Sequence, residues 1–189
     1  MNMFRRAVLT LTAIIATQNI GAAEIENVEF SESVSVAGTD LELAGLSRLY
    51  YKVIFTGAVA GLYLDDPASL DDVLADTAKR LEFVYFGGLD ADDFVAAANE
   101  SLAENLDAET LEKLRPKIDA FNDLYVDIEK NDRYAISYVP GRGLELAHNG
   151  EVLGTVAGDM FANTYFHIWF GDRPFNRHLK KTLLKGEFD

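Results

Sequence analysis

The sequence predicts an α+β fold in which helices pack on one face of a large antiparallel β-sheet. Strand-like segments come first, helical segments occupy the middle, and a β-hairpin followed by further helices ends the chain. The connections between neighbouring strand-like segments are too short for the helical crossovers that a parallel sheet requires. No linker, internal repeat or low-complexity segment divides the sequence, so we expect a single folded domain.

The N-terminal third of this domain is predicted to be β-structure. Apolar residues alternate along segment 28–36, which indicates a strand with a slip near Ser31. Segment 49–64 is rich in Tyr, Val, Ile and Phe, a composition typical of a long or broken strand. Gly57 and Gly61 interrupt it and predict a bulge or a close approach of another backbone.

The middle of the chain is predicted to hold one strand and two helices. Segment 79–86 reads as a strand. Asp90 is a good N-cap for a helix that we expect to run to about residue 105, and Asp107 caps the next helix. That second helix carries an apolar stripe, and Pro116 inside it predicts a kink or two abutting helices.

The C-terminal third returns to strands and then to helices. Segment 134–139 is predicted to be a strand, and Asn149-Gly150 between two short apolar runs is a strong hairpin signal. A helix is expected over 159–170, and a last, basic helix over 174–185.

The extreme N-terminus has the three-part pattern of a secretory signal peptide. Arg5 and Arg6 are basic, segment 7–17 is apolar and uncharged, and small residues follow at 21–23. A membrane-spanning anchor would need about 20 apolar residues. Gln18 ends the apolar run before that length is reached.

We therefore expect an exported protein, with residues 1–23 as the signal peptide and 24–189 as the domain. Cleavage is expected after Ala23, with Ala22 as the close alternative. The chain contains no cysteine, so no disulfide and no lipidated cysteine can form. A secreted chain without disulfides fits the bacterial periplasm, and we expect no membrane span after cleavage.

The charge of the chain excludes some classes of partner. The formal net charge is −14, and loss of Arg5 and Arg6 takes it to −16. A surface this negative repels phosphate backbones, so we expect no nucleic acid partner. Hydrophobic residues make up 49% of the chain, which argues against disorder.

Catalytic and metal-binding signatures are missing from the sequence. Without cysteine there is no thiol nucleophile and no zinc–thiolate site. His148, His167 and His178 fall in a hairpin and in two different helices, a pattern typical of surface or packing residues rather than metal ligands. We expect no catalytic residue of a standard type, no metal and no cofactor.

One charged residue stands in a strongly apolar strand. Strict alternation places Arg48, Tyr50 and Thr56 on one face of the predicted sheet. An arginine on a core-facing position must be paired or must meet an anion. A guanidinium and a phenol at the mouth of an apolar pocket suit a carboxylate with a hydrophobic tail. Alternatively, this face is the solvent-exposed one and Arg48 pairs with a surface acid.

An ordered series of short motifs resembles the bacterial chalcone-isomerase-like family. The motifs cover nearly the whole predicted domain, at residues 45–48, 51–55, 61–64, 138–141, 149–150, 157–161, 168–174 and 179–180. The resemblance implies an open β-sandwich, in which helices back a large antiparallel sheet. It also implies either of two activities: plant members close a flavanone ring, and related non-catalytic members bind fatty acids.

The resemblance carries some site residues over and not others. The family's arginine, which helps to hold the fatty-acid carboxylate, matches Arg48. The catalytic threonine falls at Ala58, with Thr56 two residues away. The helix that should supply tyrosine, lysine and asparagine contains neither tyrosine nor lysine, and Asn99 is the one remnant. Because these lost donors steady the developing enolate, flavonoid isomerase activity is not expected.

Two functions follow from these observations. The first is a non-catalytic binder of a small apolar carboxylic acid such as a fatty acid, with Arg48, Tyr50, Thr56 and Asn99 as ligand-binding residues. The alternative is an intramolecular lyase or isomerase of the chalcone isomerase type, acting on another substrate. A structural protein without a ligand is a third possibility, since one fold hosts several roles.

Overall fold

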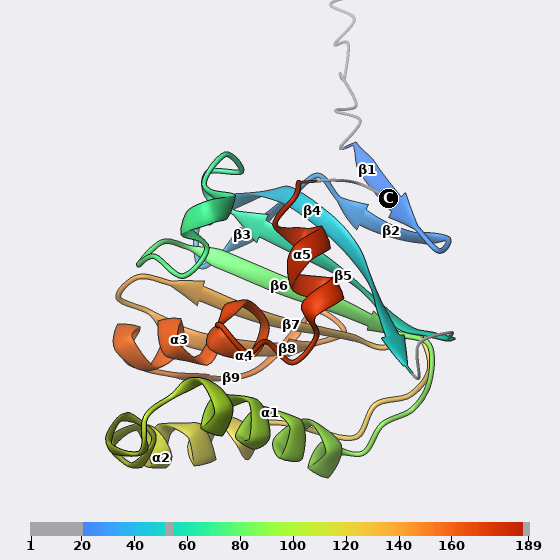
Figure 1. Cartoon of the computed structure of the whole chain (residues 1–189). Helices are drawn as coiled ribbons and strands as arrows, with labels where there is room; N and C mark the ends of the chain where they lie inside the picture. Colours follow the sequence, from blue (N-terminus) through green and yellow to red (C-terminus); the bar gives the residue numbers. More distant parts are fainter. Residues whose placement is uncertain (1–20, 52–54, 187–189) are drawn as a thin grey trace, which may run out of the picture.

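Seven antiparallel strands form one curled sheet in a computed structural model that describes residues 21–51 and 55–186 (Figure 1). Their order in the sheet is their order in the chain. The strands are β3 (Ser33–Val36), β4 (Thr39–Tyr51), β5 (Phe55–Leu64), β6 (Lys79–Tyr85), β7 (Arg133–Val139), β8 (Gly143–His148) and β9 (Glu151–Val156). A separate hairpin of β1 (Ala22–Ile25) and β2 (Val28–Ser31) precedes them.

The helices of the described residues pack on one side of this sheet (Figure 1). They are α1 (Ala91–Asn105), α2 (Ala108–Asn122), α3 (Asp159–Tyr165), α4 (His167–Phe170) and α5 (Arg177–Leu183), and a short 3-10 helix, η1 (Leu70–Asp72), lies between β5 and β6. The predicted α+β architecture, an antiparallel sheet with helices on one face, is confirmed. None of the described helices is long and apolar enough to cross a membrane.

Two hydrophobic cores lie on opposite faces of the sheet. The larger core joins the sheet to the helices, with Leu62 and Leu81 on the sheet side and Phe121 and Phe166 on the helical side. The smaller core lies under the β1–β2 hairpin, where Phe30 is fully buried. The hairpin therefore covers the sheet face that the helices leave open.

Tight turns set the register of the hairpins. Three of them reverse through two residues with positive φ, at Glu26-Asn27, Ala37-Gly38 and Asn149-Gly150. Such turns twist in the same sense as the strands that they join. The hairpin predicted at Asn149-Gly150 is confirmed.

Both glycines predicted to mark irregularities in segment 49–64 do so. Gly57 is the unpaired residue of β5 where the register with β4 shifts. Gly61 lies against Phe30, and a Cβ added there would come within 2.8 Å of the Phe30 ring.

Several predicted elements have different boundaries in the structure. Segment 49–64 is not one strand, because β4 and β5 pair as antiparallel neighbours; residues 52–54 lie outside the described residues. The predicted strand 28–36 breaks at Glu32 into β2 and β3, and the predicted helix 159–170 is α3 followed by α4. These reversals and breaks do not interrupt the apolar pattern, so the pattern alone cannot place them.

Helix α2 is continuous through Pro116, whereas the sequence predicted a kink or two helices. Its apolar stripe is buried, with Leu114, Ile118 and Phe121 packed into the larger core. This burial on both sides of the proline holds the two halves in one helix, although one backbone N–H donor is lost.

Helices α1 and α2 are an insertion between two paired strands. β6 and β7 are neighbours in the sheet, and the chain leaves β6, forms both helices and returns to β7. Leu89 and Ile128 close the neck of the insertion with two backbone hydrogen bonds, of 3.2 and 2.9 Å. The two helices are thereby placed beside the sheet at one end.

Candidate ligand-binding cavity

A cavity of about 750 Å³ lies between the sheet and the helices. Strands β4 to β7 form one wall, α1 and α4 form the other, and residues 175–176 before α5 complete the rim. Its size falls within the range of small-molecule sites, about 300–1,000 Å³. The cavity is therefore large enough for a ligand of the size of a fatty acid.

Aromatic rings make up most of the inner wall. On β6, Phe83 and Tyr85 are two residues apart and share the cavity face. Phe94 of α1 stacks on Tyr125 with ring centroids 5.3 Å apart and meets Tyr134 edge-on at 5.1 Å. Such contacts hold the rings in place, so the wall is apolar and well ordered.

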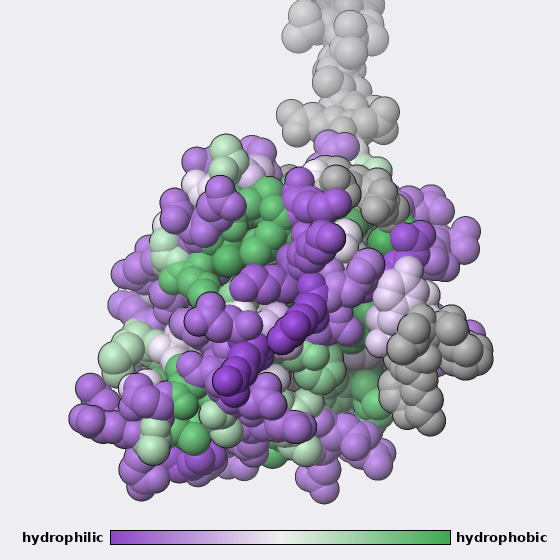
Figure 2. Space-filling view, in the orientation of Figure 1, coloured by the Kyte–Doolittle hydropathy of each residue, from purple (hydrophilic) through white to green (hydrophobic). Residues whose placement is uncertain are grey.

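The cavity has a buried end and an open end. At the buried end, Tyr134 and Ile136 are almost fully shielded from solvent. At the open end, the large apolar residues Tyr50, Leu89 and Phe175 are 36%, 38% and 48% exposed. Figure 2 shows apolar patches on the helical side of the molecule, bordered by hydrophilic residues. Exposed apolar residues around an opening are typical of a ligand entrance.

The hydroxyl groups of the cavity tyrosines remain protonated. Burial raises the pKa of Tyr85 and of Tyr125 above the ordinary value, and it raises the pKa of Tyr134 in the same direction. The hydroxyl of Tyr134 donates to the Val126 carbonyl at 2.6 Å and accepts from the Val126 N–H at 2.8 Å. These phenols act as neutral hydrogen-bonding groups rather than as bases.

Charge is nearly absent from the lining. Among the described lining residues, Asp93 is the one ionisable acid, it is exposed, and no lysine, arginine or histidine is present. The ring of His178 lies outside the lining, 5.1 Å from the ring of Tyr50. A cavity of this kind favours an apolar molecule in its interior.

A family model of chalcone isomerase-like proteins matches residues 22–185. The chain belongs to the chalcone isomerase-like family. This match covers almost all of the described residues, including every strand and helix around the cavity. The resemblance inferred from the short motifs is confirmed at the level of the family.

Among solved structures, the chain is similar to a fatty-acid binding protein of Arabidopsis thaliana. The TM-score is 0.66 at 16% sequence identity, and the superposition covers 87% of this chain and 96% of the plant protein. At this identity the similarity establishes a common fold. A search among curated proteins finds no match to the sequence.

Two of the predicted ligand-binding residues line the cavity of this chalcone isomerase-like domain. Tyr50 of β4 and Thr56 of β5 are register partners, and both lie at the open end. The consecutive residues Leu49 and Tyr50 of β4 both line the cavity, opposite the register shift at Gly57 of β5. A bulge of this kind bends its own strand, here β5, beside the open end of the cavity.

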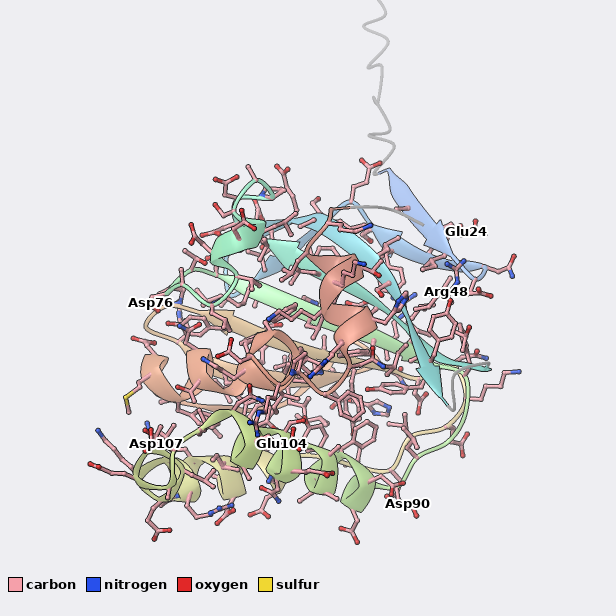
Figure 3. The ribbon with its side chains drawn as sticks, in the orientation of Figure 1. Glu24, Arg48, Asp76, Asp90, Glu104 and Asp107 are labelled. Carbon is pink, nitrogen blue, oxygen red and sulfur yellow. The ribbon has the colours of Figure 1, made fainter. Side chains whose placement is uncertain are left out.

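Arg48 is not among the described residues that line the cavity with Tyr50 and Thr56. Its Nε is 2.6 Å from Oε1 of Glu26, in the turn of the β1–β2 hairpin. In Figure 3, Arg48 lies close to this hairpin and far from Asp90 at the start of α1. This contact matches the alternative that the sequence left open, an ion pair of Arg48 with a surface acid.

Asn99 lies one layer behind the cavity wall. Its Oδ1 accepts from Asn122 at 3.3 Å, and Asn122 in turn accepts from the Tyr165 hydroxyl at 3.3 Å. The Tyr165 hydroxyl lies 3.4 Å from that of Tyr125, which lines the cavity. Asn99 is thus joined to the lining through a chain of hydrogen bonds between buried or half-buried side chains.

Sequence reasoning missed most of the inner wall. Phe83 and Tyr85 alternate along a predicted strand, and Tyr125 belongs to the predicted apolar stripe. These signals indicate burial, but they do not distinguish a packed core from the wall of a cavity. Phe94 carries no distinguishing signal, and the motif 168–174 that contains Trp169 does not by itself indicate a cavity wall.

Proposed function

We propose that this chalcone isomerase-like domain binds a fatty acid or another small apolar carboxylic acid. The observation that carries the proposal is the cavity of about 750 Å³, with aromatic walls and no cationic group among its described lining residues. The similar fold of a fatty-acid binding protein supports it. Burial of an alkyl chain against such walls contributes roughly 0.8 kcal/mol per methylene group.

The absence of charge at the buried end of the described lining determines how the acid is oriented. A carboxylate inside would lose its hydration without meeting a cation. At the open end, the hydroxyl groups of Tyr50 and Thr56 are hydrogen-bond donors. The side chain of Asn176 accepts from the Leu179 N–H through Oδ1, which leaves its amide N–H groups as donors. The carboxylate therefore stays at the rim and the chain points inward.

Contact of Arg48 with the ligand, which the family resemblance implies, is not part of this proposal. Arg48 forms an ion pair with Glu26 in the turn of the β1–β2 hairpin and is not among the described lining residues. The orientation proposed above does not depend on Arg48. Asn99 contributes indirectly, since its hydrogen-bond chain positions Tyr125 in the wall.

A separate part of the proposal concerns location. We propose that the chain is exported to the periplasm and that a signal peptide is removed near Ala23. The basic, apolar and small-residue segments of the N-terminus support this. Cleavage after Ala23 would leave Glu24 and Ile25 of β1 to pair with Glu29 and Val28 of β2.

Titration calorimetry on the delipidated protein tests ligand binding. Hexadecanoic acid should bind at one molecule per chain with a negative heat-capacity change, because apolar surface is buried. Dodecanoic and octanoic acids should bind progressively more weakly, and butanoic acid should serve as the non-binding control. Equal binding of all four acids, or no binding of any, would refute the proposal.

A further inference from the structure

Besides Tyr50 at the open end, three tyrosine side chains line the described part of the cavity, and their hydroxyl groups are not equivalent. Tyr134 bonds to both backbone groups of Val126, and Tyr125 is within 3.4 Å of the Tyr165 hydroxyl. The hydroxyl of Tyr85 makes no hydrogen bond to any residue that the structure describes. Tyr85 is nevertheless 92% buried, since its relative exposure is 8%.

The hydrogen bonds of the other buried polar side chains show whether the Tyr85 hydroxyl is sealed from solvent. Every side-chain nitrogen or oxygen that is sealed from solvent in the described part of the chain has a hydrogen-bond partner. A hydroxyl without a partner must therefore touch open space, and Tyr85 lines the cavity. The indole N–H of Trp169 likewise makes no hydrogen bond within residues 21–51 and 55–186, and Trp169 is a cavity residue that is 7% exposed, so this N–H also touches open space.

Both polar groups belong to one region of the wall. The ring of Phe83 lies 5.8 Å from that of Tyr85 and 6.1 Å from that of Trp169, so it separates the two. An indole N–H can only donate a hydrogen bond, and the raised pKa of Tyr85 keeps its hydroxyl protonated. This part of the wall therefore presents two donors in an otherwise aromatic surface.

A plain alkyl chain is a poor match for such a wall. It would displace water from the Tyr85 hydroxyl and the Trp169 N–H and would offer no acceptor in return. A ligand with an oxygen atom at this depth would accept a hydrogen bond from the wall, while the rest of its chain would contact the aromatic rings. Sites built to hydrogen-bond a ligand oxygen discriminate against analogues that lack it.

We propose that the preferred ligand is an oxygenated fatty acid, whose chain carries a hydroxyl or keto group that hydrogen-bonds to the Tyr85 hydroxyl, with the Trp169 N–H as a second donor in the same region of the wall. This inference rests on the proposed function, because it assumes that the carboxylate lies at the rim and the chain in the cavity. It adds a second polar contact, inside the cavity, that selects among apolar acids.

The test compares dodecanoic acid with its 6-, 9- and 12-hydroxy derivatives, because the depth of the contact along the chain differs among them. Wild-type protein should bind at least one hydroxy acid roughly tenfold more tightly than dodecanoic acid, the effect of one hydrogen bond. Tyr85→Phe should remove this preference and should keep or strengthen the binding of dodecanoic acid, because the alkyl chain then leaves no Tyr85 hydroxyl without an acceptor. Tyr125→Phe is the matched control and should keep the preference, since its hydroxyl already meets Tyr165.

The outcomes separate the two proposals. If dodecanoic acid binds but no hydroxy acid is preferred, the inference fails and the proposed function stands. If Tyr85→Phe weakens dodecanoic acid as much as its hydroxy derivatives, Tyr85 holds the carboxylate and the inference is wrong. If none of the four acids binds, the proposed function itself fails. A thermal melt checks folding, and Tyr85→Phe should not lower the melting temperature because no described residue loses a hydrogen bond.

Discussion

The guanidinium Nε of Arg48 lies 2.6 Å from a carboxylate oxygen of Glu26 and joins β4 to the turn of the β1–β2 hairpin. A second arginine, Arg133 of β7, joins the sheet to β2 of the hairpin by donating to the Glu29 carbonyl at 2.8 Å. The ring of Phe30 lies beneath that guanidinium at 5.3 Å. Two arginines of the sheet thus fasten the hairpin over the smaller core.

This arrangement predicts that Arg48 affects stability more than ligand affinity. Arg48→Ala and Glu26→Gln should each lower the free energy of unfolding by about 0.2–1 kcal/mol, the range for a partly exposed ion pair. Fatty-acid affinity should stay within about twofold, because Arg48 pairs with Glu26 and is not among the described residues that line the cavity. Denaturant unfolding and titration calorimetry measure the two effects. Glu24→Gln, on the exposed face of β1, is the control, and a tenfold loss of affinity in Arg48→Ala would place the arginine in contact with the ligand.

Filling the cavity from α1 should abolish binding. Ala97 lines the cavity and Ala96, its neighbour, is exposed on the same helix. Ala97→Trp should lower fatty-acid affinity at least about tenfold, because the indole occupies the space of several methylene groups. Ala96→Trp should bind like wild type. If both variants bind normally in calorimetry, the ligand lies elsewhere.

Lys79 should make stability depend on pH in the alkaline range. It is fully buried in β6, and its Nζ donates to the Ala75 carbonyl at 2.6 Å and to Asn163 Oδ1 at 2.8 Å. Burial lowers the pKa of this ammonium from 10.5 to about 8, against the opposing effect of Asp76 and Asp65. Between these two pKa values the unfolded chain holds the proton and the folded chain does not.

Because the unfolded state then binds more protons, the free energy of unfolding should rise from about pH 8 to about pH 10. Above pH 10 the buried tyrosines act in the opposite direction, since their pKa values are raised in the folded state. Lys79→Met should remove the rise, and Lys113→Met, on an exposed position of α2, should keep it. Denaturant unfolding at a series of pH values measures this. A flat profile for wild type would contradict the lowered pKa.

Chalcone cyclisation should not exceed the spontaneous rate. The part of α1 that lines the cavity presents Phe94, Ala97 and Ala98 beside the exposed Asp93, and none of these is a tyrosine or lysine. The buried phenols of the wall stay protonated because burial raises their pKa. Chalcone absorbance followed at high protein concentration tests this. Turnover above the uncatalysed rate would show that other donors stabilise the enolate.

Export should be visible at the N-terminus of the purified protein. Protein from the cell envelope is expected to begin at Glu24, or at Ala23 if cleavage follows Ala22. N-terminal sequencing or intact mass measurement identifies the first residue. Cytoplasmic protein that retains Met1 would contradict export.

The parts of the fold that sequence predicted well depend on local chemistry. Asn149-Gly150 specifies its hairpin because both residues adopt positive φ without strain. Asp107 caps α2 as expected, and its carboxylate accepts from the Thr110 N–H at 2.9 Å. The reversal between β4 and β5 was missed because both strands are apolar.

The site was predicted less completely, for a physical reason. Tyr50 and Thr56 both line the cavity, whereas Arg48 pairs with Glu26 of the β1–β2 hairpin, a contact between elements that the sequence pattern does not show. The role of Asn99 depends on Asn122 and Tyr165, which meet it only in the folded chain. Periodicity describes one element at a time and cannot show such contacts between elements.

The neck that Leu89 and Ile128 close makes the α1–α2 insertion, which supplies part of the helical wall of the cavity, a unit that can be replaced without changing the sheet. The chain between these two residues leaves the sheet and returns to it at one point, and the flanking strands β6 and β7 pair directly with each other. Doubling the length of such a loop costs only about 0.6 kcal/mol in closure entropy. A relative with a different insertion could therefore have a differently shaped cavity and accept a different ligand, while the seven-stranded sheet stays the same.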